Sequence, residues 1–239
     1  MGIRQIRDVL LKFLMIYLSG RSEIMERPVR WQLPIGFKFL ILHSENQLMI
    51  LVTGGTGIVG AQVLFDLTSA GKKVRALRRP SSQLSIVNMV FDQNRDLLRN
   101  IEWVEGSVTD VFDVAEALKE VDEVYHCAAK VSFHPDDSQE IMRVNVGGTA
   151  NMVNIALEMG IKKFCHVSSI AALGRVEENK MMDENVFWKS SKYNSLYAIS
   201  KYNGEREVWR AMEEGLNAVI VSPSIIIGPG NWTTGSSAM

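Results

Sequence analysis

The chain has 239 residues, of which 46% are hydrophobic and 22% are charged, and its formal net charge is −1 at pH 7. This length can bury one sizeable core, and the near-neutral charge gives no footprint for binding nucleic acid or a strongly charged partner. The two cysteines and four histidines follow no disulfide or metal-ligand spacing, so we expect a cytoplasmic protein with no metal ion.

The first 48 residues are predicted to lie outside the main fold. An apolar run over 9–18 follows two arginines and has helical spacing, which also suits a basic amphipathic helix on a membrane surface. The run is too short to span a bilayer, and Lys12 interrupts it. We therefore favour an N-terminal extension over 1–48, and membrane contact through residues 1–20 is the less favoured alternative.

From residue 49 onwards, short apolar runs alternate with segments of helical periodicity. Strands are predicted at 49–52, 73–78, 101–104, 121–127, 163–168 and 218–221. Helices are predicted at 58–70, 83–99, 110–120, 137–159 and 194–214. Strands joined through helices of this length form a parallel sheet covered on both faces. The predicted fold class is therefore α/β, a Rossmann-type doubly wound parallel sheet over residues 49–230.

A glycine-rich turn joins the first predicted strand to the first helix, with the sequence Thr53-Gly54-Gly55-Thr56-Gly57-Ile58-Val59-Gly60. A helix that begins at such a turn points backbone N–H groups and its positive end at one spot, and glycines let a pyrophosphate approach closely. We therefore predict dinucleotide binding, and a tight turn without a ligand is the alternative. The candidate contacts are Gly54, Thr56, Gly57, Ile58, Val59 and Gly60.

The end of the second strand bears on which dinucleotide is bound. Folds that prefer NAD carry an acidic residue there, which accepts hydrogen bonds from the ribose hydroxyls. This chain has Arg78 and Arg79 instead, and two guanidinium groups can pair with a 2′-phosphate. We therefore expect NADP in preference to NAD, and surface arginines that merely end a strand are the alternative.

Tyr197 and Lys201 lie four residues apart in a predicted helix, which places them on one face. A tyrosine is a poor base at neutral pH unless a nearby positive charge stabilises the phenolate, and Lys201 supplies such a charge. Ser169 ends the fifth predicted strand, where its hydroxyl can bind a substrate carbonyl. These three residues are the predicted catalytic set, and the polar stretch 171–193 is predicted to form a lip over the substrate.

In order and spacing, these motifs resemble the extended short-chain dehydrogenase/reductases of the NAD-dependent epimerase/dehydratase family. The resemblance covers residues 49–230 and also rests on His126-Cys127-Ala128-Ala129, Asn145-Val146-Gly147-Gly148-Thr149, Val167-Ser168-Ser169 and Pro223 with Gly228-Pro229-Gly230. It implies that Tyr197 is the general acid/base, with Lys201 and Ser169 as its partners, and that Asn145 supports the site near the lysine. The further cofactor contacts that it implies are Ser107, Val108, Ala128, Ala129, Tyr197, Lys201, Pro223 and Ser224.

The resemblance implies an NAD(P)-dependent oxidoreductase that moves a hydride between nicotinamide and a carbonyl or alcohol. The segments 129–133 and 168–174 look more like dihydroflavonol reductases and 3β-hydroxysteroid dehydrogenases, so a carbonyl reductase is the first expectation and a nucleotide-sugar epimerase the second. A cofactor-binding module without turnover is the alternative from another class. The expected partners are a small carbonyl or sugar-nucleotide substrate and a second copy in a homodimer. Because relatives continue with a substrate lobe, residues 231–239 are expected to begin a lobe that this chain largely lacks.

Overall fold

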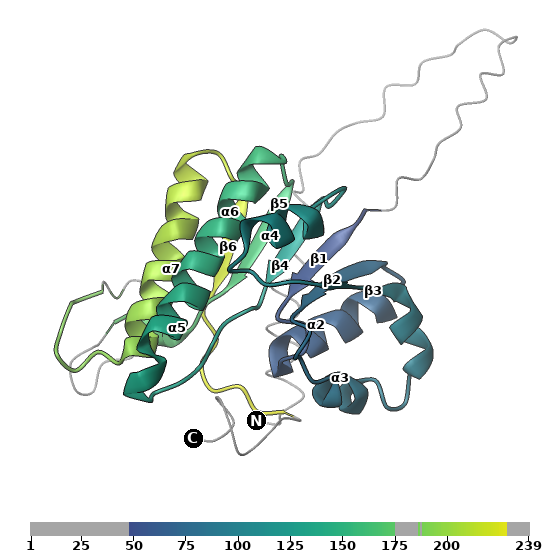
Figure 1. Ribbon diagram of the computed structural model, residues 1–239, viewed down its shortest axis with the longest axis horizontal. Coiled ribbons are helices and arrows are strands. Elements are labelled where there is room, and N and C mark those ends of the chain that lie inside the picture. The colour runs from purple at the N-terminus through teal and green to yellow at the C-terminus, as the bar shows by residue number, and fades with distance from the viewer. Residues whose placement is uncertain (1–47, 175–185, 187, 229–239) are drawn as a thin grey trace, which may run out of the picture. The chain divides into compact units, whose positions relative to one another are not determined.

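A computed structural model describes residues 48–174, 186 and 188–228, which belong to one unit spanning residues 47–239 (Figure 1). The expectations for residues 1–48, for most of the predicted lip and for 231–239 fall outside the described residues or almost entirely so. Within the described residues, the strands are β1 (Ile50–Thr53), β2 (Val74–Arg78), β3 (Ile101–Glu105), β4 (Glu123–His126), β5 (Lys163–Val167) and β6 (Ala218–Val221).

These strands form one sheet in the order β3-β2-β1-β4-β5-β6, and every neighbouring pair is parallel. The chain moves outward from β1 to β3, then returns to the other side of β1 and continues through β4 to β6. Ligands of such sheets bind beyond the carboxyl ends of the strands where this direction reverses, here between β1 and β4. The predicted Rossmann-type doubly wound fold is confirmed.

The longer helices are α2 (Ile58–Ser69), α3 (Ser85–Val90), α4 (Val111–Ala117), α5 (Ser138–Met142), α6 (Gly148–Glu158) and α7 (Leu196–Glu213). α2 packs with α3 on one face of the sheet, and α6 lies between α4 and α7 on the other (Figure 1). On the α6 face, Leu51, Val124 and Phe164 are fully or almost fully buried against Met152 and Val208. Within the described ranges, no helix is both long and apolar enough to cross a membrane.

The single helix predicted over 83–99 is wrong. The structure has the short α3, then a turn, then a 3₁₀ helix at Arg95–Asn100. Phe91 caps α3 and is fully buried edge-to-face against Phe65 of α2, with 5.3 Å between the ring centroids. Asn94 leaves the helical region at φ −137° and ψ 45°. Burial of Phe91 and the turn preference of the Asp and Asn residues around it therefore outweigh the continuous helical pattern.

The helix predicted over 137–159 is present but changes its winding. After a 3₁₀ turn at Pro135–Asp137, α5 passes into a π turn at Arg143–Gly147, which continues as α6. A π turn holds one residue more than an α turn, and such turns are frequent at functional sites. Asn145 lies in this turn and is 3% exposed. The predicted helix over 110–120 is shorter, since α4 ends at Ala117, but Asp110 is its N-cap as predicted and accepts from the amides of Phe112 and Asp113.

Candidate functional site

The glycine turn between β1 and α2 has a conformation that larger residues would disrupt. Gly54 has φ +69°, and a Cβ atom there would lie 2.6 Å from the backbone nitrogen of Ala128. A Cβ atom on Gly60 would lie 2.2 Å from the carbonyl oxygen of Gly54. Gly57 is the N-cap of α2 and has no side-chain cap, so the first amides of α2 have no acceptor from that position. The turn thus leaves backbone donors at the carboxyl end of β1.

A cleft of about 440 Å³ opens beside this turn, at the carboxyl ends of β1 to β4. This volume falls in the usual range for small-molecule and cofactor sites, about 300 to 1,000 Å³. The predicted cofactor residues that line the cleft are Gly54, Thr56, Gly57, Arg78, Arg79, Ser107, Val108, Ala128 and Ala129. The predicted residues outside its lining are Ile58, Val59, Gly60, Tyr197, Lys201, Pro223 and Ser224.

The segment after β6 lies on another side of the site. The carbonyl oxygen of Pro223 accepts a hydrogen bond from the amide of Ile170, 3.1 Å away, which puts Pro223 beside the residue that follows Ser169. Ser224 is exposed. Further along, a Cβ atom on Gly228 would lie 3.1 Å from the Ile58 side chain at the start of α2. The segment after β6 therefore runs between the Ser169 region and the beginning of α2.

Arg78 lines the cleft, but it has a carboxylate partner that the sequence of its own strand does not reveal. Its Nη2 lies 2.8 Å from Oε1 of Glu105, its register partner on β3. Its guanidinium carbon also lies 5.9 Å from the centroid of the Trp103 ring. Arg79 is exposed at the cleft. A carboxylate therefore stands near the end of β2 after all, although it belongs to β3.

Ser107 reaches the cleft at the end of β3. Its amide donates to Oδ2 of Asp113 at 2.8 Å, and its hydroxyl bonds to that of Thr109 at 2.8 Å. The side chain is thus turned to a neighbour within its own loop, and Asp113, from the first turn of α4, holds the loop backbone.

The three predicted catalytic residues meet at the end of β5. The Ser169 side chain lies close enough to Tyr197 to affect its phenol. Burial raises the pKa of Tyr197, and the neighbouring Ser169 side chain lowers it in part. Lys201 is 3% exposed, and its Nζ donates to the carbonyl oxygen of Val167 at 2.8 Å. Burial lowers the pKa of Lys201 to about 8, while the negative charge of Glu205 acts in the opposite direction.

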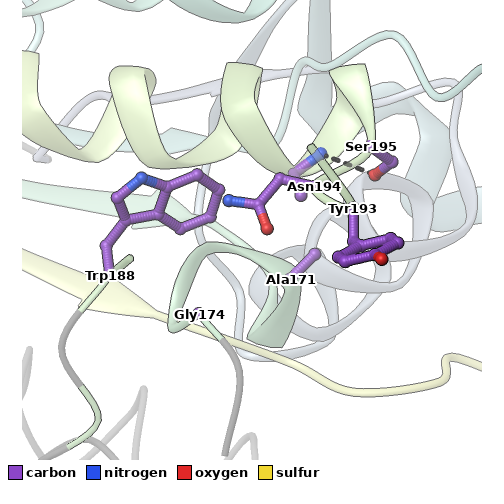
Figure 2. Close-up of a pocket in the computed structure, with 7 residues that line it drawn as sticks. Ala171, Gly174, Trp188, Tyr193, Asn194 and Ser195 are labelled. Atoms are coloured by element: carbon purple, nitrogen blue, oxygen red, sulfur yellow. Dashed lines mark hydrogen bonds between the residues drawn. The ribbon is translucent and has the colours of Figure 1, made fainter. Parts of the chain in front are cut away.

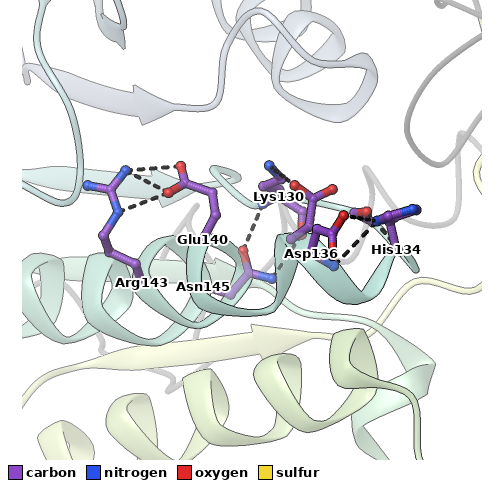
Figure 3. A network of polar contacts seen from close by, with 8 residues as sticks. Lys130, His134, Asp136, Glu140, Arg143 and Asn145 are labelled. Carbon is purple, nitrogen blue, oxygen red and sulfur yellow. Dashed lines mark hydrogen bonds and ion pairs between the residues drawn. The ribbon is translucent and has the colours of Figure 1, made fainter.

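Asn145 ties the cleft wall to the helix that carries Tyr197 and Lys201. Its Oδ1 accepts from the amide of Lys130 at 2.7 Å, and its Nδ2 donates to the carbonyl oxygen of Lys130 at 3.0 Å (Figure 3). The same Nδ2 donates to Oγ of Ser200 at 2.9 Å. The side-chain amide is therefore engaged in positioning backbone rather than directed into the cleft.

Two features of this wall were not predicted from the sequence. Lys130 pairs through Nζ with Oδ1 of Asp137 at 2.8 Å. Glu140 and Arg143 form an ion pair of 2.8 Å and both line the cleft (Figure 3). Their i, i+3 spacing is visible in the sequence. Nothing in that spacing shows, however, that this side of the helix borders the cleft.

A smaller hollow of about 210 Å³ lies at the start of α7. Trp188, Tyr193 and Asn194 line one side, with Ala171 and Gly174 opposite (Figure 2). Ser195 is the N-cap of α7 and accepts from the amide of Ala198 at 3.1 Å. Residues 171–174 and 188–193 of the predicted lip thus border a hollow at the start of α7, while the role of the segment as a lip stays a prediction.

A doubly wound parallel sheet with a glycine turn after β1 and a cleft at the β1–β4 reversal defines the class of Rossmann-type proteins. Residues 50–239 match the NAD dependent epimerase/dehydratase family, and the chain belongs to that family.

Similar proteins agree with this assignment. The chain is 36% identical over 180 residues to the "Putative dihydroflavonol 4-reductase" of Synechocystis sp., covering 74% of this chain and 49% of the relative. It is 33% identical to sterol demethylase protein B of Methylococcus capsulatus, covering 75% of this chain and 52% of the relative. A crystal structure of a short-chain dehydrogenase/reductase superfamily protein from Agrobacterium tumefaciens with bound NAD is 29% identical, with a TM-score of 0.58 over 73% of this chain and 48% of that one. The chain spans about half the length of the curated relatives it matches.

Proposed function

We propose that this chain carries the dinucleotide-binding and proton-transfer parts of an NAD(P)-dependent oxidoreductase that reduces a carbonyl. The observation that carries the proposal is the grouping of Ser169, Tyr197 and the buried Lys201 at the carboxyl end of β5. The names of the relatives support it, since they include a 3-beta-hydroxysteroid dehydrogenase and a cinnamoyl-CoA reductase.

The residues present fit a dinucleotide. Close contact with Ala128 and with the Gly54 carbonyl requires glycine at positions 54 and 60, so the turn keeps free of side chains the space that a pyrophosphate needs. Gly57 opens α2 without a side-chain cap, which leaves helix amides to bind an anion. When bound, a nicotinamide dinucleotide supplies or accepts the hydride.

The protonation states favour reduction as the direction in which Tyr197 acts. Because burial raises its pKa, Tyr197 is a phenol at neutral pH and can donate a proton to an oxygen that becomes an alkoxide. Ser169, which lies beside it, presents a second hydroxyl to the same oxygen. Lys201 stabilises the phenolate left after the transfer, because its charge lies on the same helical face one turn away.

An apolar ring system on the substrate is favoured over a sugar nucleotide by the surroundings of Tyr197. Phe133 is 53% exposed, and its ring packs edge-to-face against Tyr197, with 5.9 Å between centroids. Trp188 and Tyr193 line the neighbouring hollow. The aromatic surface of these three side chains suits an apolar ring on the substrate.

The catalytic proposal is tested by Tyr197→Phe. Oxidation of NADPH is followed with a panel of cyclic and aromatic ketones, and we expect turnover to fall at least a hundredfold, since loss of general acid catalysis typically costs 10² to 10⁴. Tyr202→Phe, on the same helix, is the matched control and should keep its activity. Unchanged turnover in Tyr197→Phe would refute the assigned role. NADPH binding without turnover on any substrate would favour the alternative of a binding module.

The preference for NADP is a separate proposal. Arg79 is exposed at the cleft and Arg78 is paired with Glu105, so Arg79 is the better placed partner for a 2′-phosphate. Titration of nicotinamide fluorescence should show that Arg79→Ala weakens NADPH about tenfold and NADH little, as expected for loss of one charge-assisted contact. Arg99→Ala, on the exposed 3₁₀ helix, is the control. Equal loss for both nucleotides would contradict the proposal.

A further inference from the structure

Three polar residues lie in one row across the carboxyl end of the sheet. Thr53 of β1 is the register partner of His126 on β4, which is the register partner of His166 on β5. Thr53 and His126 are completely buried, and His166 is 1% exposed. The fold and the proposed chemistry give no role to His126, although it stands in one of the segments by which the family is recognised.

His126 is hydrogen-bonded at both ring nitrogens. Its Nδ1 lies 2.7 Å from Oγ1 of Thr53, and its Nε2 lies 3.1 Å from Oγ1 of Thr149 on α6. Two further hydrogen bonds extend this network, one at each end. The amide of Ala128 donates to Oγ1 of Thr53 at 3.3 Å, and Oγ1 of Thr149 donates to the carbonyl oxygen of Asn145 at 2.7 Å.

Counting donors fixes the direction of every bond. The Asn145 carbonyl can only accept, so it takes the single hydroxyl hydrogen of Thr149. The bond between Thr149 and His126 therefore needs a hydrogen on Nε2. A neutral imidazole with its hydrogen on Nε2 accepts at Nδ1, and the Thr53 hydroxyl donates there. Burial lowers the pKa of His126 to about 3, which agrees with a neutral ring.

The hydrogen-bond network ends at the π turn. The Asn145 carbonyl oxygen lies between the Thr149 hydroxyl and α7, where a Cβ atom on Gly204 would approach it to 2.9 Å. The side chain of the same Asn145 clamps both backbone groups of Lys130, which lines the cleft (Figure 3). It also donates to the hydroxyl of Ser200. Ser200 in turn donates to the carbonyl oxygen of Tyr197 at 2.8 Å.

We propose that His126 is a positioning residue, which in its Nε2–H tautomer holds Thr149 so that the π turn presents Asn145 to the cleft wall and to α7 at once. The ring joins the glycine-turn strand, through Thr53, to the helix that carries Tyr197 and Lys201. Its effect on the cofactor passes through the backbone of Ala128 at one end and of Lys130 at the other. That part of the inference rests on the proposed function, whereas the tautomer and the hydrogen bonds do not.

The test uses the pair Thr149→Ser and Thr149→Val, with His126→Gln and His126→Leu beside it. Thr149→Ser keeps the hydroxyl and Thr149→Val keeps the shape, while Gln at 126 can restore a donor near the position of Nε2. Ring nitrogen shifts from ¹⁵N-labelled chain give the tautomer at neutral pH. Hydrogen exchange at the Lys130 amide reports the Asn145 clamp. Fluorescence titration with NADPH reports the cleft.

We expect His126 to be protonated at Nε2 alone in the unaltered chain. Thr149→Val and His126→Leu should each speed exchange at the Lys130 amide at least tenfold, leaving the central amides of β1 protected, and should weaken NADPH about tenfold, since misplaced backbone at a site costs factors of this size or more. Thr149→Ser should stay within about twofold of the unaltered chain, and His126→Gln should recover part of the loss.

Protonation at Nδ1, or Thr149→Val with unaltered exchange at Lys130, would overturn the inference. A variant that loses all amide protection has unfolded, and then the tautomer and the Thr149→Ser comparison decide. If the unaltered chain binds no NADPH, the proposed function fails, while the tautomer and the exchange at Lys130 still test the role of His126.

Discussion

Replacing His166 should remove a large part of the acid sensitivity of this fold. His166 is 1% exposed on β5, and neither of its ring nitrogens has a hydrogen-bond partner within the described residues. Burial lowers its pKa well below 6.5, and the positive charge of Lys201 and the nearby His126 act in the same direction. The folded protein therefore holds this ring neutral, whereas the unfolded chain protonates it as pH falls through 6.5.

The size of the effect follows from linkage. A group whose pKa is lowered by folding stabilises the native state above its unfolded pKa, and this contribution is lost as pH falls towards the folded pKa. Between pH 7.5 and pH 5, an unfolded pKa of 6.5 gives a loss of about 2 kcal/mol. The result hardly depends on the folded pKa, provided that it lies well below 5. His126, with a pKa of about 3, adds a loss of similar size, so the two rings together cost about 4 kcal/mol.

The assay is urea unfolding of the unaltered chain and of His166→Leu at both pH values. Leucine has a similar volume and no buried donor or acceptor, so we expect the variant to be at least as stable at pH 7.5. Its loss of unfolding free energy down to pH 5 should be smaller by about 2 kcal/mol. Phe164→Leu, on the same strand and fully buried, is the control, and its pH dependence should parallel the unaltered chain. A loss in His166→Leu equal to that of the unaltered chain would refute the reasoning.

Two further predictions concern the turn and the lysine. Gly54→Ala should lower the unfolding free energy by about 3 kcal/mol, because of the left-handed backbone and the contact with Ala128, and it should abolish NADPH binding. Gly71→Ala is the control, since Gly71 has φ +74° with open space around it, and it should cost only about 1 kcal/mol. Equal losses of the two variants in urea unfolding would contradict this prediction. Because folding lowers the pKa of Lys201 from 10.5 to about 8, its contribution makes the chain more stable by about 2 kcal/mol from pH 7 to pH 9.5. Lys201→Met should lack this rise, and a variant that keeps it would show that the lysine is not the titrating group.

The order of strands and the glycine turn could be predicted because they depend on local patterns. Apolar runs, helix stops and the glycine spacing each act within a few residues, and crossover rules then fix the sheet. The same logic placed Ser169, Tyr197 and Lys201 at one edge, and in the structure they lie around the end of β5, while their catalytic roles stay predictions. The helix predicted over 83–99 failed because the burial of Phe91 against Phe65 is a tertiary effect.

The features that escaped prediction all depend on register or on winding. Whether Arg78 meets a carboxylate depends on which residue of β3 lies opposite it, and Glu105 is 27 residues away in sequence. The partnership of His126 with Thr53 likewise follows from the alignment of β1 with β4. The π turn at Asn145 inserts one residue into an otherwise regular helical pattern, and no periodicity in the sequence signals it.

Burial of the Lys201 ammonium is the main electrostatic cost to stability at this site, and neighbouring groups offset part of it. Glu205 lies one turn further along α7 and is 2% exposed. Burial raises the pKa of Glu205, whereas the charge of Lys201 lowers it, so each group favours the ionised form of the other. His126 is neutral, and burial raises the pKa of Cys127, which stays a thiol. Among these neighbours, Glu205 is therefore the group whose charge offsets the burial of the Lys201 ammonium.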